Sequence, residues 1–465
     1  MTGPMRPLAR PLSRRRALQL GAAAPAALLA ACAAPSPSPA ASPQETATAT
    51  PPASPSPSPS PTPTSTPPTG RTLFRDAALA DGRSATLQRG ISVLVEGGRV
   101  AWIRPVDGEE DAGDAEVVDA AGATIVPGMV DGHAHVTGPG GARWIERFDD
   151  PTDRLLAYAE ANGRLAWEAG IRWLRDVGSP RRQDPEDGRT RALALGIRDR
   201  WAGRHGFPAI RAAGTWLTGA GVLAGRGLQA RDADELLALA LGQLDEGADL
   251  VKLYLEGPDP AASPWSAAEV ARVVEAVHAR GARVTAHAAR LAGARVAAEA
   301  GVDAIEHGFE LDAAVAARMA ERDIMLVSTL TVYRSWISFG RTTTIPNFAG
   351  QGRPAVWQAQ LERAEASVRT AHAAGVRIAA GTDFGGGSSR ANQLAWEVES
   401  LVAAGLEPVE ALAAATWRGG ELLGEADAGV IREGGPADFF LVHGDPLSDP
   451  AALWRVWRHA VPPAR

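Results

Sequence analysis

The stretch Asp249-Leu-Val-Lys-Leu-Tyr-Leu-Glu-Gly257 contains the only lysine of the chain, Lys252, because every other basic residue among the 47 lysines and arginines is an arginine. Arginine cannot replace lysine where a primary amine has to lose its proton, whereas surface charges and ion pairs accept either residue. The apolar run 250–255 around Lys252 is typical of a buried strand. We therefore predict that Lys252 lies at a buried strand end and performs amine chemistry: a Schiff base, a proton transfer, or the capture of carbon dioxide as a carbamate.

The composition is that of an acidic globular protein. A chain of 465 residues can hold one large domain and a smaller one. Its net charge of −7 argues against a nucleic-acid partner. The single cysteine, Cys32, excludes an intramolecular disulfide and a zinc site built on several thiolates. Any metal must therefore be held by histidine, aspartate, glutamate or modified lysine.

The first 70 residues differ from the rest of the chain. Residues 1–31 join a basic stretch to an apolar stretch that is too short to span a bilayer permanently. This segment resembles a twin-arginine signal peptide, and Leu29-Ala-Ala-Cys32 resembles a lipobox. Residues 32–70 alternate proline with serine, threonine and alanine, which predicts a disordered tether. We expect an exported lipoprotein that is attached through Cys32 to the outer face of the cell membrane.

From residue 71 the pattern indicates an α/β fold. Residues 71–126 and 427–465 carry strand-like segments, so we expect a small β-sandwich domain built from both chain ends. Residues 127–426 alternate short apolar strands with longer helical patterns, which is typical of a (β/α)8 TIM barrel. The expected strands are 125–130, 171–176, 209–213, 250–255, 283–287, 303–307, 324–328 and 377–382. The expected helices are 152–169, 186–203, 232–246, 266–280, 290–300, 312–322, 355–374 and 391–404.

Side chains that carry chemistry stand at the C-terminal ends of these strands, where barrels of this kind have their active sites. His133 and His135 follow the first strand two residues apart, so in extended chain both imidazoles can reach one ion. The later strand ends add Lys252, His287, His307 and Asp383. Imidazole and carboxylate suit zinc and similar divalent ions. The sequence therefore predicts a metal centre at one rim of the barrel.

Four motifs together resemble the metal-dependent amidohydrolase superfamily over about residues 71–455. They are Pro127-Gly-Met-Val-Asp-Gly-His-Ala-His135, Gly170-Ile-Arg-Trp-Leu-Arg-Asp-Val-Gly178, Ala379-Ala-Gly-Thr-Asp-Phe-Gly385, and Glu410-Ala-Leu-Ala-Ala-Ala-Thr416 with Gly429-Val-Ile-Arg-Glu-Gly434. The lysine of the fourth strand is similar to that of the binuclear, carbamylated-lysine subtype. The pattern looks nearest to prolidase-like and imidazolonepropionase-related members.

This resemblance implies two divalent metal ions, zinc being the expected one, and carbon dioxide bound as a carbamate on Lys252. It implies that one ion is held by His133 and His135, the second by His287 and His307, and both by the carbamate. Asp383 would contact the first ion and act as the catalytic residue. It would accept the proton of a metal-bridging hydroxide and return it to the leaving amine.

We expect a hydrolase of C–N bonds in small substrates such as dipeptides or N-acyl amino acids. Tyr254, on the strand of Lys252, and Arg334, near the seventh strand end, are candidate substrate contacts. A cyclic-amide or lactone hydrolase or a deaminase on the same fold stays open. The related deaminases carry a glutamate shortly after the fifth-strand histidine, whereas His287 is followed by Ala-Ala-Arg290. The non-enzymatic alternative is a metal- or ligand-binding surface lipoprotein, against which the complete hydroxide-generating set argues. The oligomeric state is left open.

Overall fold

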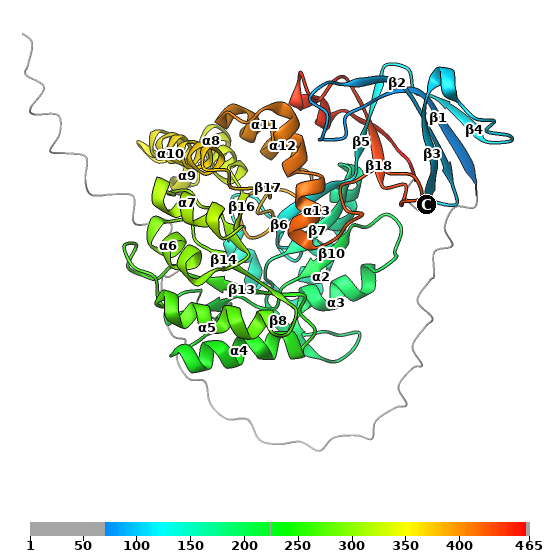
Figure 1. The fold of residues 1–465 in the computed structure, drawn as a ribbon. Helices are drawn as coiled ribbons and strands as arrows, with labels where there is room; N and C mark the ends of the chain where they lie inside the picture. The colour runs from blue at the N-terminus through cyan, green and yellow to red at the C-terminus, as the bar shows by residue number, and fades with distance from the viewer. Residues whose placement is uncertain (1–69, 224, 462–465) are drawn as a thin grey trace, which may run out of the picture.

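A computed structural model of the chain describes residues 70–223 and 225–461. The expected signal peptide, tether and lipidated Cys32 lie outside these residues and stay predictions. Among the described residues, no helix is both long and apolar enough to cross a membrane. The described chain has a β-rich part beside a larger part in which helices surround parallel strands (Figure 1).

The β-rich part is one sheet to which both ends of the chain contribute. Its seven strands follow the order β19-β18-β5-β1-β2-β3, with β4 paired to β1. They are β1 (Arg71–Leu79), β2 (Gln88–Glu96), β3 (Arg99–Pro105), β4 (Glu116–Asp119), β5 (Ala123–Pro127), β18 (Phe439–His443) and β19 (Val456–His459). Phe74 and Phe439 pack edge to face at 5.3 Å between ring centroids, and both are fully buried. These apolar contacts hold the two ends of the chain together.

The larger part contains eight parallel strands in the order that a (β/α)8 barrel requires. They are β6 (Met129–Ala134), β7 (Ile171–Asp176), β10 (Ala209–Ala212), β13 (Leu250–Tyr254), β14 (Arg283–His287), β15 (Ala304–Glu306), β16 (Met325–Ser328) and β17 (Ile378–Ala380). Their hydrogen bonds form two sheets, β10-β7-β6 and a second that runs from β13 to β17. Isolated bridges, Ala213 to Leu250 and Ala134 to Phe384, connect these sheets at both junctions. The expected architecture is therefore confirmed in part, because the strand order agrees but the ladder is interrupted twice.

Amphipathic helices cover the outside of these strands (Figure 1). In α5 (Ala267–His278), for example, Val270, Val273, Val274 and Val277 are buried, and Ser266 forms a capping box with Glu269. The other long helices are α2 (Thr152–Glu168), α3 (Leu193–Trp201), α4 (Ala233–Asp245), α6 (Leu291–Ala300), α7 (Ala313–Glu321), α8 (Thr331–Thr342), α10 (Arg353–Ala373) and α11 (Leu394–Ala404). The short helices are α9 (Pro346–Ala349), α12 (Pro408–Ala414) and α13 (Trp417–Leu423).

The expected first strand, 125–130, is wrong in its bounds, because this apolar run belongs to two different sheets. β5 ends at Pro127 in the β-rich sheet, and β6 begins at Met129. Gly128 lies between them and donates its N–H to the carbonyl of Asp438 at 2.6 Å. A Cβ at this position would lie 2.3 Å from Cγ of Arg172, so the junction requires glycine.

The expected helix 186–203 is half correct. Its first part is the loop and second strand of a hairpin in which β9 (Thr190–Ala192) pairs with the preceding β8 (Arg181–Gln183), and α3 begins only at Leu193. Asp184 closes the hairpin loop, because its N–H donates to Arg189 at 2.9 Å and its carbonyl accepts from Gly188 at 2.9 Å. Gly188 has φ of +70°, which favours glycine at the turn.

Candidate metal centre

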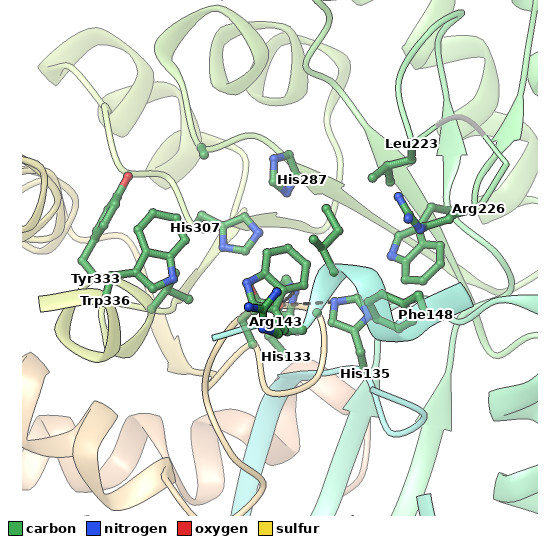
Figure 2. Close-up of a pocket in the computed structure, with 18 of the residues that line it drawn as sticks. His133, His135, Arg143, Phe148, Leu223, Arg226, His287, His307, Tyr333 and Trp336 are labelled. Carbon is green, nitrogen blue, oxygen red and sulfur yellow. Dashed lines mark ion pairs between the residues drawn. The ribbon is translucent and has the colours of Figure 1, made fainter. Parts of the chain in front are cut away.

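The six residues predicted to bind metal all line one pocket at the C-terminal ends of the parallel strands (Figure 2). They come from the ends of five different strands, β6, β13, β14, β15 and β17, and share a pocket only because of the barrel order. These residues are His133, His135, Lys252, His287, His307 and Asp383.

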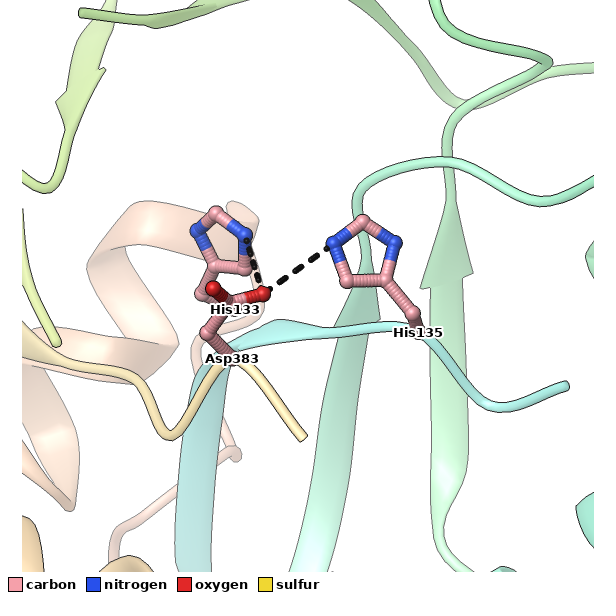
Figure 3. A group of neighbouring side chains, drawn as sticks. All are labelled: His133, His135 and Asp383. Carbon is pink, nitrogen blue, oxygen red and sulfur yellow. Dashed lines mark ion pairs between the residues drawn. The ribbon is translucent and has the colours of Figure 1, made fainter. Parts of the chain in front are cut away.

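His133, His135 and Asp383 form the tightest group (Figure 3). Their potential ligand atoms lie within 4.8 Å of one another. Nε2 of each imidazole is 3.3 Å from Oδ1 of Asp383. All three side chains are buried. Two nitrogens and one oxygen that converge in this way can hold a divalent ion such as zinc.

Hydrogen bonds fix which nitrogen of each imidazole faces this group. Nδ1 of His133 lies 2.6 Å from Oε2 of Glu306, and Nδ1 of His135 lies 2.7 Å from the carbonyl oxygen of Gly178. A carboxylate and a carbonyl accept, so both Nδ1 atoms donate and both Nε2 atoms keep a free lone pair. This is the tautomer that metal-binding histidines need.

Glu306 is itself held by a buried network. It is fully buried, and its Oε1 accepts from Arg175 and from the hydroxyl of Thr285. Burial alone would raise the pKa of Glu306, but Arg175, Lys252 and His133 outweigh it and hold this pKa well below its usual range. Glu306 therefore stays a carboxylate and can accept from His133.

His287 and His307 lie beside the first group. Their ring centroids are 4.6 Å apart, and the centroid of His307 is 4.7 Å from that of His133. Nδ1 of His307 lies 2.8 Å from the hydroxyl oxygen of Thr329. Burial and then the neighbouring imidazoles lower the pKa of His307 well below its usual value. The ring is thus neutral, which is the form that binds metal.

Two of these residues adopt an uncommon backbone conformation. His307 has φ of +70° and Asp383 has φ of +53°, although neither is glycine. Such strain persists only where the surrounding structure imposes it, and it is concentrated at functional sites. The strained backbone places both side chains toward the pocket.

The amine of Lys252 has no hydrogen-bond partner among the described residues, although the side chain is only 3% exposed. Burial lowers its pKa to about 8. A buried amine without a partner is costly and calls for an explanation.

The two candidate substrate contacts differ in position. Tyr254 lines the pocket, and its ring stacks on His287 at 3.8 Å between centroids and 8° between planes. Arg334 lies on α8 and does not belong to the described pocket lining. Its guanidinium pairs with Glu365 of α10 at 3.3 Å.

Sequence reasoning did not identify Glu306 and Arg175 as part of this site. A signal was present, because Glu306 ends the otherwise apolar strand Ala304–Glu306 and Arg175 is one of three charged residues in the short strand Ile171–Asp176. Charged residues are rarely fully buried unless they are paired. Two such residues in parallel strands could have been matched as a buried pair.

Known proteins match this chain over most of its length. Residues 124–457 match the Amidohydrolase family. An uncharacterised protein of Mycobacterium tuberculosis is 31% identical over 384 residues, which cover 78% of this chain and 91% of that protein. The imidazolonepropionase of Anaeromyxobacter dehalogenans is 27% identical over 425 residues, covering 80% of this chain and 90% of the relative.

Among solved structures, that of a Xaa-Pro dipeptidase with methionine bound in its active site is similar, with a TM-score of 0.70 and 24% identity. The match covers 84% of this chain and 99% of that structure, and it shows the fold alone. The sequence match over residues 124–457 shows the family as well as the fold, and it agrees with the resemblance inferred from the motifs. The chain belongs to the amidohydrolase family, whose members hydrolyse C–N bonds.

Proposed function

We propose that this protein is a metal-dependent hydrolase of amide bonds in small substrates such as dipeptides or N-acyl amino acids. Membership of the amidohydrolase family supports hydrolysis of C–N bonds. The observation that carries the proposal is the convergence of four imidazoles, one carboxylate and one unpartnered amine in a single pocket.

The residues fit a pair of divalent ions. His133, His135 and Asp383 would hold one ion, and His287 and His307 would hold the other. A carbamate formed on Lys252 would bind both, and zinc is the expected metal for this set of ligands. When bound, the ions supply a water molecule of lowered pKa and a polarised substrate carbonyl.

Asp383 is suited to move the proton of that reaction. Burial would raise its pKa, but His133, His135 and His307 hold it well below the usual value. Asp383 is therefore an ionised carboxylate. Its Oδ1 faces the two imidazoles, so Oδ2 is the atom that would take a proton from water and return it to the leaving amine.

His287 is held in place by its neighbours. Tyr254 stacks on one face of the ring, and Oε2 of Glu256 lies 3.5 Å from its Nε2. Glu256 also accepts the N–H of Arg290 at 2.7 Å, which fixes this carboxylate. These contacts limit the rotation of the imidazole and orient it before substrate arrives.

The experiment is a measurement of metal content combined with a substrate panel. The protein is loaded with zinc and bicarbonate and offered N-acyl amino acids, dipeptides, lactams and lactones. We expect release of amine from the open-chain amides, loss of this activity with a chelator, and recovery with zinc plus bicarbonate. Hydrolysis of lactams or lactones alone would contradict the amide assignment, and metal binding without any hydrolysis would support a binding lipoprotein.

A further inference from the structure

The pocket has two aromatic walls on opposite sides of the predicted metal ligands. Phe148 and Trp216 lie beside His135, and we call them the His135 wall. The His307 wall consists of Phe309, Tyr333, Trp336 and Phe348. Figure 2 shows Tyr333 and Trp336 beyond His307 on one side and Phe148 beside His135 on the other.

The strand order explains why the walls are opposed. Phe148 and Trp216 come from segments that follow β6 and β10, whereas Phe309 follows β15 and the rest of the His307 wall follows β16. β13 and β14, which carry Lys252 and His287, lie between β10 and β15. On the other side, β17 leads to Asp383 and lies between β16 and β6. The predicted ligands thus separate the walls.

The His135 wall is packed and preformed. The rings of Phe148 and Trp216 lie edge to face at 5.4 Å, and Trp216 lies 5.5 Å from the ring of His135. Phe148 and Trp216 are both buried. Aromatic rings that support one another in this way present a firm apolar surface to a ligand.

The His307 wall is a longer chain of ring contacts. Phe309 lies 4.7 Å from Tyr333, which lies 5.4 Å from Trp336 at a plane angle of 89°. Trp336 lies 6.3 Å from Phe348. All of these side chains are buried. The wall is therefore also formed without a ligand.

Neither wall offers an unpaired charge. Apart from the predicted ligands, the charged side chains that line the described pocket are Arg143, Glu146 and Arg226. Arg143 and Glu146 form an exposed pair at 3.5 Å, and Arg226 pairs with Asp149 at 3.1 Å and 2.5 Å. A charged group seated against either wall would lose its hydration without gaining an ionic partner.

We propose that the substrate carries an aromatic or bulky apolar, uncharged group on each side of the scissile amide, one against each wall. This inference rests on the proposed function, because the scissile bond has to lie at the ligands between the walls. Burial of one ring in place of a small group should raise kcat/KM about tenfold to a hundredfold. The two gains should multiply, because the walls are separate.

Four N-acyl amino acids test this with the metal-loaded protein: benzoyl-phenylalanine, benzoyl-glycine, acetyl-phenylalanine and acetyl-glycine. We expect benzoyl-phenylalanine to react best, with a loss of about tenfold to a hundredfold in kcat/KM for each ring removed. Metal-dependent hydrolysis of all four within about threefold of one another would overturn the inference and leave the proposed function standing.

Binding is read separately with the four corresponding sulfonamides, which lack the scissile amide. Tryptophan fluorescence should rank the affinities of these sulfonamides in the same order as the kcat/KM values of the four amides. Equal affinities would overturn the inference. The expected ranking without hydrolysis of any amide would overturn the proposed function while supporting the two walls.

Variants of the wall residues show which ring of the substrate contacts which wall. Phe148→Leu should remove the preference for one ring, and Trp336→Leu the preference for the other. Phe348→Leu repeats the second test away from the predicted ligands. Phe339→Leu is the matched control, because this ring lies on α8 and packs on Phe348 at 5.4 Å but does not line the described pocket. Equal losses on all four substrates in the Phe148 and Trp336 variants, at unchanged metal content, would overturn the inference.

Discussion

Nδ1 of His133 lies 2.6 Å from Oε2 of Glu306, and both side chains are buried. The contact joins a predicted metal ligand on β6 to a carboxylate on β15. It directs Nε2 of His133 toward Asp383. Carboxylates in this position fix the tautomer of a metal-binding histidine and raise its basicity.

Glu306→Gln should therefore weaken metal binding by about tenfold to a hundredfold. The amide keeps the shape of the side chain but removes the charge that balances Arg175 and orients His133. Competition with a chelator measures the affinity. Glu310→Gln is the control, because Glu310 is exposed four residues further along the chain. An unchanged affinity in Glu306→Gln would contradict the role of this contact.

Gly386→Ala should disrupt the same centre through sterics alone. A Cβ at Gly386 would lie 1.9 Å from Cδ2 of His135, so the imidazole has to move. We expect loss of metal and of most activity, read by metal analysis and by kcat/KM. Gly242→Ala is the control, because nothing lies within 4 Å of a Cβ there. Alanine at this position in α4 should stabilise the protein by up to about 1 kcal/mol. A Gly386→Ala protein with full metal content would show that the ring of His135 can be displaced without cost.

The junction of the β-rich part and the larger part should make the stability of the protein depend on pH. Arg172 of β7 lies 2.9 Å from Nδ1 of His459 in β19, so the imidazole has to accept and stay neutral. Burial and then Arg172 lower the pKa of His459 from 6.5 to about 4. The unfolded chain therefore binds this proton first as the pH falls, and stability is lost between about pH 6.5 and pH 4. Thermal unfolding across this range should show a smaller loss for His459→Gln, whereas parallel curves for the variant and the original protein would refute the linkage.

The strand ends could be predicted because the same short stretches show where a strand ends and where reactive side chains lie. His133 and Asp383 come shortly after a short apolar run, so the same residues mark the end of a strand and a reactive side chain. Lys252 lies inside its apolar run, and the structure places it in the middle of β13 and not at the expected strand end. The boundary at Gly128 could not be predicted in this way. Residues 123–130 are mostly apolar on both sides of Pro127-Gly128, and the pairing of β5 with β18 and of β6 with β7 assigns the two halves to different sheets.

The helix that carries Tyr333 and Trp336 of the His307 wall was missed for a physical reason. α8 has no capping side chain of its own at Leu330. Glu397 accepts the N–H groups of Leu330 at 3.1 Å and Thr331 at 2.7 Å instead. This carboxylate comes from α11, more than sixty residues away in sequence, so local patterns give no sign of where α8 begins.

Lys252→Arg should lose one of two metal ions and most of the activity. A guanidinium stays charged and cannot form a carbamate, and two cations would repel it. Metal analysis per chain and kcat/KM with the best substrate of the panel measure both effects. Lys252→Met separates the effect of a positive charge from the loss of the carbamate, because methionine keeps much of the side-chain length but carries no charge. Circular dichroism should show both variants folded, and retention of two ions and full activity in either would contradict the role of the amine.

The most direct measurement is ¹³C NMR of the zinc-loaded protein equilibrated with ¹³C-bicarbonate. Lys252 is the only lysine, so a carbamate on a side chain can form at one position only. We predict one protein-bound carbamate signal, present with two metal ions per chain and absent from Lys252→Arg. A protein that binds two ions and hydrolyses amides without this signal would contradict the account.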